Sequence, residues 1–114
     1  MMNKIVKAKV WLELGQGISF CHGKAKLLSA IDKFGSIRRA TQNVNMSYKR
    51  AWRYIRELES GLGCKILSTT IGGADGGGAQ LTEAGQHLLH EYKSAKAQAD
   101  LTLQEHVESF SRSF

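Results

Sequence analysis

The 114-residue sequence contains no proline, only two cysteines and no uninterrupted apolar run long enough to cross a membrane. Its first residues, MMNKIVKAKVWLELG, also lack the continuous apolar core of a secretion signal. We therefore expect Cys21 and Cys64 to be reduced thiols in a cytoplasmic protein rather than partners in a disulfide. With 42% hydrophobic and 23% charged residues, the chain has the composition of an ordinary soluble domain with a modest core.

Acidic residues are absent between Lys33 and Arg56, a window that holds seven basic residues. Outside the window, nine basic residues face ten acidic ones, so the net charge of +6 arises entirely within it. A local concentration of positive charge is typical of a surface that meets a polyanion. On charge alone, a solvated basic face without a partner is an equal alternative.

Apolar and polar residues alternate over residues 6–14, which predicts a half-buried strand, and residues 18–21 are suited to a short second strand. Helical spacing follows after Gly23 and is ended by Gly35. Ser36 is a candidate cap for a second, short helix.

Asn45 and Met46 then make a tight connection, and Ser47 caps a third helix that we expect over about residues 47–60. A hairpin follows, because β-branched residues and a short returning strand flank a glycine-rich loop. Thr82 caps a last helix that runs nearly to the C-terminus. This order predicts an α+β, mainly α fold, a winged helix-turn-helix with an N-terminal strand or hairpin.

The third helix separates into two faces when it is rotated by about 100° per residue. Ala51, Ile55, Leu58 and Leu62 share the face that should pack inward. Trp52 borders this face, and core packing is its favoured interpretation over base stacking.

The outward face is basic and polar, as a helix needs when it inserts into a major groove about 12 Å wide. Lysine and arginine can neutralise phosphates, arginine can also form two bonds to guanine, and helix N-termini attract phosphate. The wing is poor in cations, with no lysine or arginine between Lys65 and Lys93, so backbone amides of its glycines are the expected contacts; a flexible hairpin tip is the alternative. The predicted DNA-binding residues are Ser36, Arg38, Arg39, Ser47, Tyr48, Lys49, Arg50, Arg53, Arg56, Gly76 and Gly77.

Apolar residues recur at steps of three or four along the last helix, farther than so small a domain can cover. We expect this helix to pair with its copy in a homodimer. The predicted interface residues are Leu88, Tyr92, Ala95, Ala99, Leu103 and Phe110. Residues 1–81, with the wing at about 65–81, would then be the DNA-binding domain and residues 82–114 the dimerisation helix.

Metal and enzyme chemistry have little support in the sequence. His87 and His90 are spaced for one helix face, but no third ligand is evident, so no metal or other cofactor is expected. No nucleophile–base motif or paired-carboxylate site is present, and we do not expect an enzyme.

Several motifs together resemble the N-terminal DNA-binding domain of the ModE family of molybdate-responsive regulators, which is of LysR type. They are "GSI" opening the second helix, "MSYKRAW" opening the third, the wing tip "GGADGGGAQLT" and "TEAG" opening the last helix. The resemblance covers about residues 23–92 and implies a dimer on a palindromic operator. In that family molybdate-binding domains follow. Because the printed chain ends at Phe114, we expect any molybdate sensing to reside in another protein.

The sequence therefore predicts a sequence-specific, DNA-binding transcriptional regulator that uses the major groove. A winged-helix module that binds a protein partner rather than DNA is the alternative. An oxyanion sensor built on the glycine loop is a second one.

Overall fold

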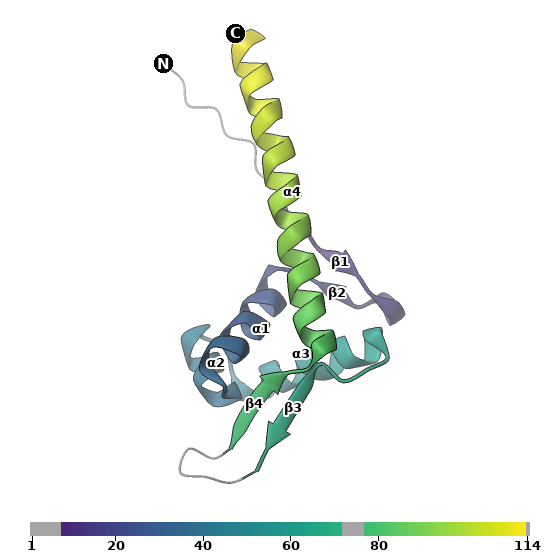
Figure 1. Cartoon of the computed structure of the whole chain (residues 1–114), viewed down its shortest axis with the longest axis vertical. Helices are drawn as coiled ribbons and strands as arrows, with labels where there is room; N and C mark the ends of the chain where they lie inside the picture. The colour runs from purple at the N-terminus through teal and green to yellow at the C-terminus, as the bar shows by residue number, and fades with distance from the viewer. Residues whose placement is uncertain (1–7, 72–76, 114) are drawn as a thin grey trace.

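The computed structural model describes residues 8–71 and 77–113, and it confirms a mainly α winged helix-turn-helix with a long C-terminal helix (Figure 1). Three helices form the body, and a two-stranded wing and the last helix complete it. In chain order the elements are β1 (Leu12–Glu13), the 3-10 turn η1 (Gly15–Gly17), β2 (Ser19–Phe20), α1 (His22–Phe34), α2 (Ile37–Asn43), α3 (Tyr48–Leu62), β3 (Leu67–Thr70), β4 (Gly78–Leu81) and α4 (Glu83–Ser113).

The N-terminal hairpin is much shorter than the alternation over residues 6–14 predicted. Only Leu12 and Glu13 form the first strand, and they pair antiparallel with Phe20 and Ser19. Residues 8–11 are not in a strand, and residues 6 and 7 lie outside the described part of the chain. The reason is the second strand, which ends at Phe20 because α1 begins at His22, so residues 8–11 have no partner there.

Left-handed backbone conformations end the helices and shape the turn between α2 and α3. Gly35 ends α1 at φ 65°, and Gly63 ends α3 at φ 74°. Each glycine donates its backbone N–H to a carbonyl in the last turn of its helix. Asn45 adopts φ 55° in the turn, a conformation that asparagine tolerates better than most residues. The Met46 N–H then bonds to the Thr41 carbonyl at 2.9 Å, which closes the turn.

The core lies where α1, α3 and the start of α4 meet the two hairpins. Phe20 is fully buried and contacts Tyr92 edge-to-face, with ring centroids 5.4 Å apart. Leu88 and Tyr92 are only 5% and 4% exposed within this single chain. Their predicted place in a dimer interface is therefore wrong, because the domain's own core already covers them.

Hydrogen bonds attach the wing to the helices on either side of it. The Ala79 N–H donates to the Gly35 carbonyl at 2.9 Å, and the Ile66 N–H donates to the Glu59 carboxylate at 2.9 Å. At the base of the wing, Thr82 Oγ1 donates to the Lys65 carbonyl at 2.7 Å and accepts from the N–H of Gly85, as a helix cap. The wing is thus held at a defined place beside α3.

α4 extends well beyond the body of the domain (Figure 1). Its 31 residues correspond to a length of about 46 Å, and the whole chain measures 61 × 30 × 21 Å. The buried residues of α4 all lie between Gly85 and Tyr92. Within the described residues, no helix combines the length and the apolar character needed to span a bilayer.

Candidate nucleic-acid interface

The first turns of α3 form an exposed surface at the end of a well-capped helix. Ser47 Oγ accepts the N–H of Arg50 at 3.1 Å, so the hydroxyl satisfies one of the free amides of the first turn. Ala51, Ile55 and Leu58 are fully buried, which confirms the inward face predicted by rotation. The opposite face, with Lys49, Arg50, Arg53 and Arg56, is exposed.

Tyr48 and Trp52 lie together at the edge of this surface. Tyr48 is 50% exposed, and its ring meets that of Trp52 edge-to-face at 6.3 Å. Trp52 packs against the core but is only partly buried, so its expected core role is correct only in part. Trp52 lines two hollows of the surface.

The first hollow is a groove of about 690 Å³ between α2, the start of α3 and the wing. Arg38, Arg39 and Gln42 line its α2 side, and Thr69 and Thr70 line its wing side. Ser36, at its edge, is a buried cap whose Oγ accepts the Arg39 N–H at 3.3 Å. The groove therefore combines two arginines with hydroxyl groups, which are side chains that commonly contact phosphates.

The second hollow lies on the outer face of α3 and measures about 610 Å³. Apart from Trp52, its lining is polar or cationic, and the residues are Ser47, Lys49, Arg50, Trp52, Arg53 and Arg56. The structure thus brings together five residues that the sequence predicted as DNA contacts. Arg56 is the last of these five residues along α3.

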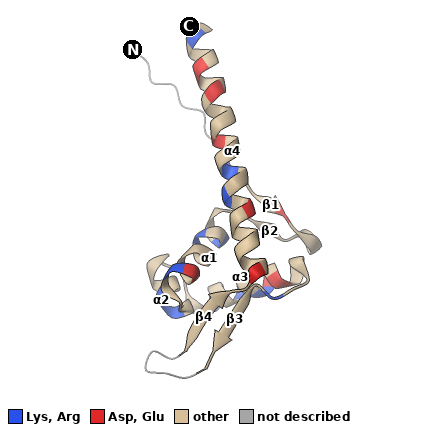
Figure 2. Cartoon of the chain, in the orientation of Figure 1, with Lys and Arg blue, Asp and Glu red and all other residues tan. Residues whose placement is uncertain are grey.

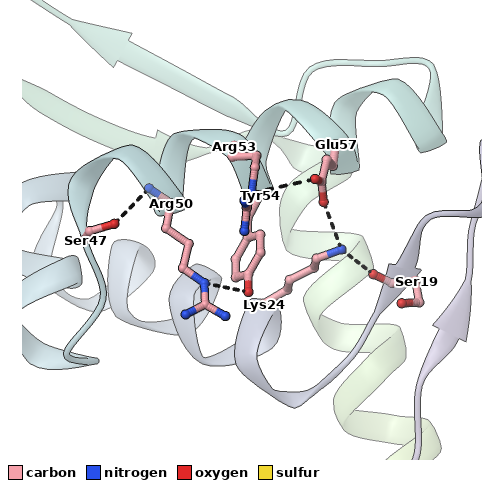
Figure 3. Close-up of polar contacts among 7 residues, drawn as sticks. All are labelled: Ser19, Lys24, Ser47, Arg50, Arg53, Tyr54 and Glu57. Carbon is pink, nitrogen blue, oxygen red and sulfur yellow. Dashed lines mark hydrogen bonds and ion pairs between the residues drawn. The ribbon is translucent and has the colours of Figure 1, made fainter.

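A polar network behind this face was not anticipated from the sequence (Figure 3). Arg50 Nε donates to Tyr54 Oη at 2.9 Å. Glu57 pairs with Lys24 of α1 at 3.4 Å and lies 3.9 Å from Arg53 Nε. The i, i+4 spacing of Arg50 with Tyr54 and of Arg53 with Glu57 was a usable signal, but the contribution of Lys24 depends on how α1 packs on α3.

Residues 23–86 match the family of bacterial regulatory helix-turn-helix proteins of the lysR type, and this region spans α1, α2, α3 and the wing. The chain belongs to this family.

The curated relatives of this LysR-type chain include two proteins whose names refer to molybdenum and one that is named as a DNA-binding transcriptional regulator. The chain is 38% identical to the molybdenum-pterin-binding protein MopB of Rhodobacter capsulatus over 65% of the chain and 27% of the relative. It is 33% identical to the molybdenum transport protein ModE of Azotobacter vinelandii over 76% of the chain and 32% of the relative. It is 35% identical to the DNA-binding transcriptional dual regulator ModE of Escherichia coli K12 over 71% of the chain and 31% of the relative. The chain spans about a third of the length of these relatives.

Family and geometry agree on a ModE-like, DNA-binding domain of a transcriptional regulator. The second helix of the helix-turn-helix, α3, is the one that carries the basic, solvent-facing surface, as the predicted recognition helix must.

The wing of this LysR-type domain carries no charged side chain in its two strands (Figure 2). Gly77, one of the two glycines predicted to contact DNA, lines the groove beside α2. Gly76, the other predicted glycine, lies outside the described residues. Ile71, the residue that follows β3, is fully exposed and also borders the groove.

The remaining predicted interface residues lie on the part of α4 that projects from the body. Ala95, Ala99 and Leu103 are partly buried, and Phe110 is 45% exposed. At about 100° per residue they continue the same helix face that Leu88 and Tyr92 present to the core.

Cys21 and Cys64 are free, exposed thiols on different parts of the domain. His87 lies 3.9 Å from Glu91 on α4 rather than in a cluster with His90. Across residues 8–71 and 77–113, no group of three histidine, cysteine or acidic side chains is placed to hold a metal ion.

Proposed function

We propose that the chain binds a palindromic duplex operator as a symmetric homodimer, with α3 of each subunit in a major groove. The observation that carries the proposal is the exposed basic face of α3 around its outer hollow. The first turns of that helix contain four cations and no acidic residue before Glu57. Such a surface suits phosphate neutralisation and guanine reading without a competing negative charge.

The wing and α2 complete the proposed footprint on either side of the recognition helix. Arg38 and Arg39 at the groove would contact the phosphate backbone, while Gly77 brings backbone amides near it. Because the wing strands carry no cations, most of the salt dependence of binding should come from α2 and α3.

The distal part of α4 is the proposed pairing surface of the dimer. Ala95, Ala99 and Leu103 follow one face beyond the last buried residue, and the two alanines allow two helices to approach closely. Two-fold symmetry of the protein would then match the symmetry of a palindromic site.

A titration of labelled duplex at two salt concentrations tests this function. Binding should weaken steeply as salt rises, and Lys49→Ala or Arg53→Ala should each lower the salt slope by about 1. Lys93→Ala is the matched control, because it removes the same charge from an exposed position on α4. Undetectable or salt-insensitive binding would instead favour a protein-interaction module.

We further propose that this domain acts without catalysis and does not itself bind molybdate. Molybdate should then change neither the thermal stability of the chain nor its affinity for DNA. A rise in melting temperature with molybdate would show that the domain senses the oxyanion itself.

A further inference from the structure

Tyr54 lies among three cations on the side of the recognition helix, although it is not itself one of the predicted DNA contacts. Its ring centroid is 5.3 Å from the Arg50 guanidinium carbon, 5.6 Å from that of Arg53 and 5.3 Å from Lys24 Nζ. Its hydroxyl accepts from Arg50 Nε at 2.9 Å. One half-buried aromatic residue therefore contacts two of the three arginines that line the outer hollow, Arg50 and Arg53.

The bond to Arg50 uses one particular donor of the guanidinium. Arginine has five N–H donors, and the Nε–H is the one taken by Tyr54. The two terminal amino groups remain available side by side, which is the geometry needed for two bonds to guanine O6 and N7. The tyrosine hydroxyl thus selects which edge of Arg50 is presented.

Tyr54 is in turn held from the body of the domain (Figure 3). Lys24 of α1 is 9% exposed, lies over the Tyr54 ring and donates to the Ser19 carbonyl of β2 at 2.8 Å. The same ammonium pairs with Glu57, whose other oxygen faces Arg53. Contacts from the hairpin and α1 therefore reach both arginines through Tyr54 and Glu57.

We propose that Tyr54 is a positioning residue for sequence reading, which sets Arg50 for a two-point contact to a base before DNA arrives. The inference rests on the proposed DNA-binding function and assigns specificity to a side chain behind the contact surface. A long side chain that is already oriented loses less conformational freedom on binding, so the restraint favours the correct site. Tyr54 acts on DNA only through Arg50.

The variant Tyr54→Phe removes the hydroxyl and keeps the ring. The operator is first selected from random DNA with the unaltered protein. We expect Tyr54→Phe to weaken binding to this operator by about fivefold, as the loss of one hydrogen bond would. Binding to scrambled duplex and the salt slope should not change, because no phosphate contact is lost. Selection from random DNA with this variant should relax the base preference at one position of each half-site.

A double-mutant cycle separates positioning from direct contact. In an Arg50→Ala background, Tyr54→Phe should have no further effect, because the residue it orients is gone. The same should hold with Arg50→Lys, since lysine has no guanidinium edge to orient. Melting temperatures of all variants, measured by circular dichroism, report whether a loss reflects a damaged fold.

Three outcomes would overturn the inference. If the unaltered protein binds its operator and Tyr54→Phe has the same affinity and base preference, the role of Tyr54 is overturned while the proposed function stands. An equal loss in the Arg50→Ala background would show that Tyr54 contacts DNA itself or only supports the helix. Absence of duplex binding by the unaltered protein would overturn the proposed function and this inference with it.

Discussion

The helix backbone at Gly85 lies directly against the carbonyl group of Ile66. A Cβ added to Gly85 would be 2.4 Å from the Ile66 oxygen and 3.3 Å from its carbon, distances that no rotation of a side chain can relieve. Here the start of α4 crosses the base of the wing, and only a glycine allows the two backbones to approach so closely.

Gly85→Ala should therefore destabilise the domain, although alanine is the better helix former by about 1 kcal/mol. We expect a net loss of about 1–3 kcal/mol in the free energy of unfolding, measured by urea denaturation. Gly23→Ala is the control, because an added Cβ in the first turn of α1 meets no atom within 4 Å. Equal stability of the two variants would show that α4 can shift away from the wing at little cost.

Ser47 caps α3 and also lines its outer hollow, and two substitutions separate capping from the proposed contact with DNA. Ser47→Ala should lower the free energy of unfolding by about 1 kcal/mol through loss of the cap. Ser47→Asp should restore stability, since aspartate caps well and suits a helix N-terminus, yet it should weaken DNA binding on the order of tenfold by placing a negative charge near phosphate. Thermal melts and duplex titrations on both variants make the comparison. If DNA affinity changes in parallel with stability in both variants, Ser47 acts only as a helix cap.

The proposed dimer predicts that a charge on the distal stripe of α4 separates the subunits without unfolding them. Leu103→Asp should sediment as a monomer at micromolar concentration and should bind a palindrome no more tightly than a half-site. Leu101→Asp introduces the same change on the opposite face, at a position that is 61% exposed, and should remain dimeric. A monomeric unaltered protein at that concentration would contradict the proposal.

Lys24 is buried, and its ammonium contacts both the Ser19 carbonyl and the Glu57 carboxylate. Lys24→Met keeps the apolar stem but leaves both acceptors without this donor, so we expect a loss of about 1–3 kcal/mol in the free energy of unfolding. Lys26→Met, at an exposed position of the same helix, should change stability by less than about 0.5 kcal/mol. Chemical denaturation of the two variants measures this difference. Equal free energies of unfolding for Lys24→Met and Lys26→Met would mean that water replaces the ammonium at no cost.

Helical periodicity was sufficient to predict which face of α3 is buried, because Ala51, Ile55 and Leu58 follow one another at helical spacing. The same reasoning assigned Leu88 and Tyr92 to the wrong neighbour. Periodicity identifies an apolar face, but whether the chain's own core or a second subunit covers it depends on where the helix lies in space.

The network around Tyr54 shows a different limit. Its spacing to Arg50 is local and was readable in the sequence, whereas Lys24 lies thirty positions away and reaches the ring only through the packing of α1 on α3. The short N-terminal hairpin has a similar cause, since alternation predicts a strand but pairing requires a partner strand of equal length.

All the buried residues of α4 lie within its first ten positions, and the rest of the helix projects from the body. In the proposed dimer, this projecting part alone sets the angle and the distance between the two recognition helices. Each residue inserted between the core and the pairing surface would turn the body of each subunit by about 100° around its own α4. Operator spacing could thus change in evolution through mutations that touch neither DNA nor core, while the base preference of each half-site stays the same.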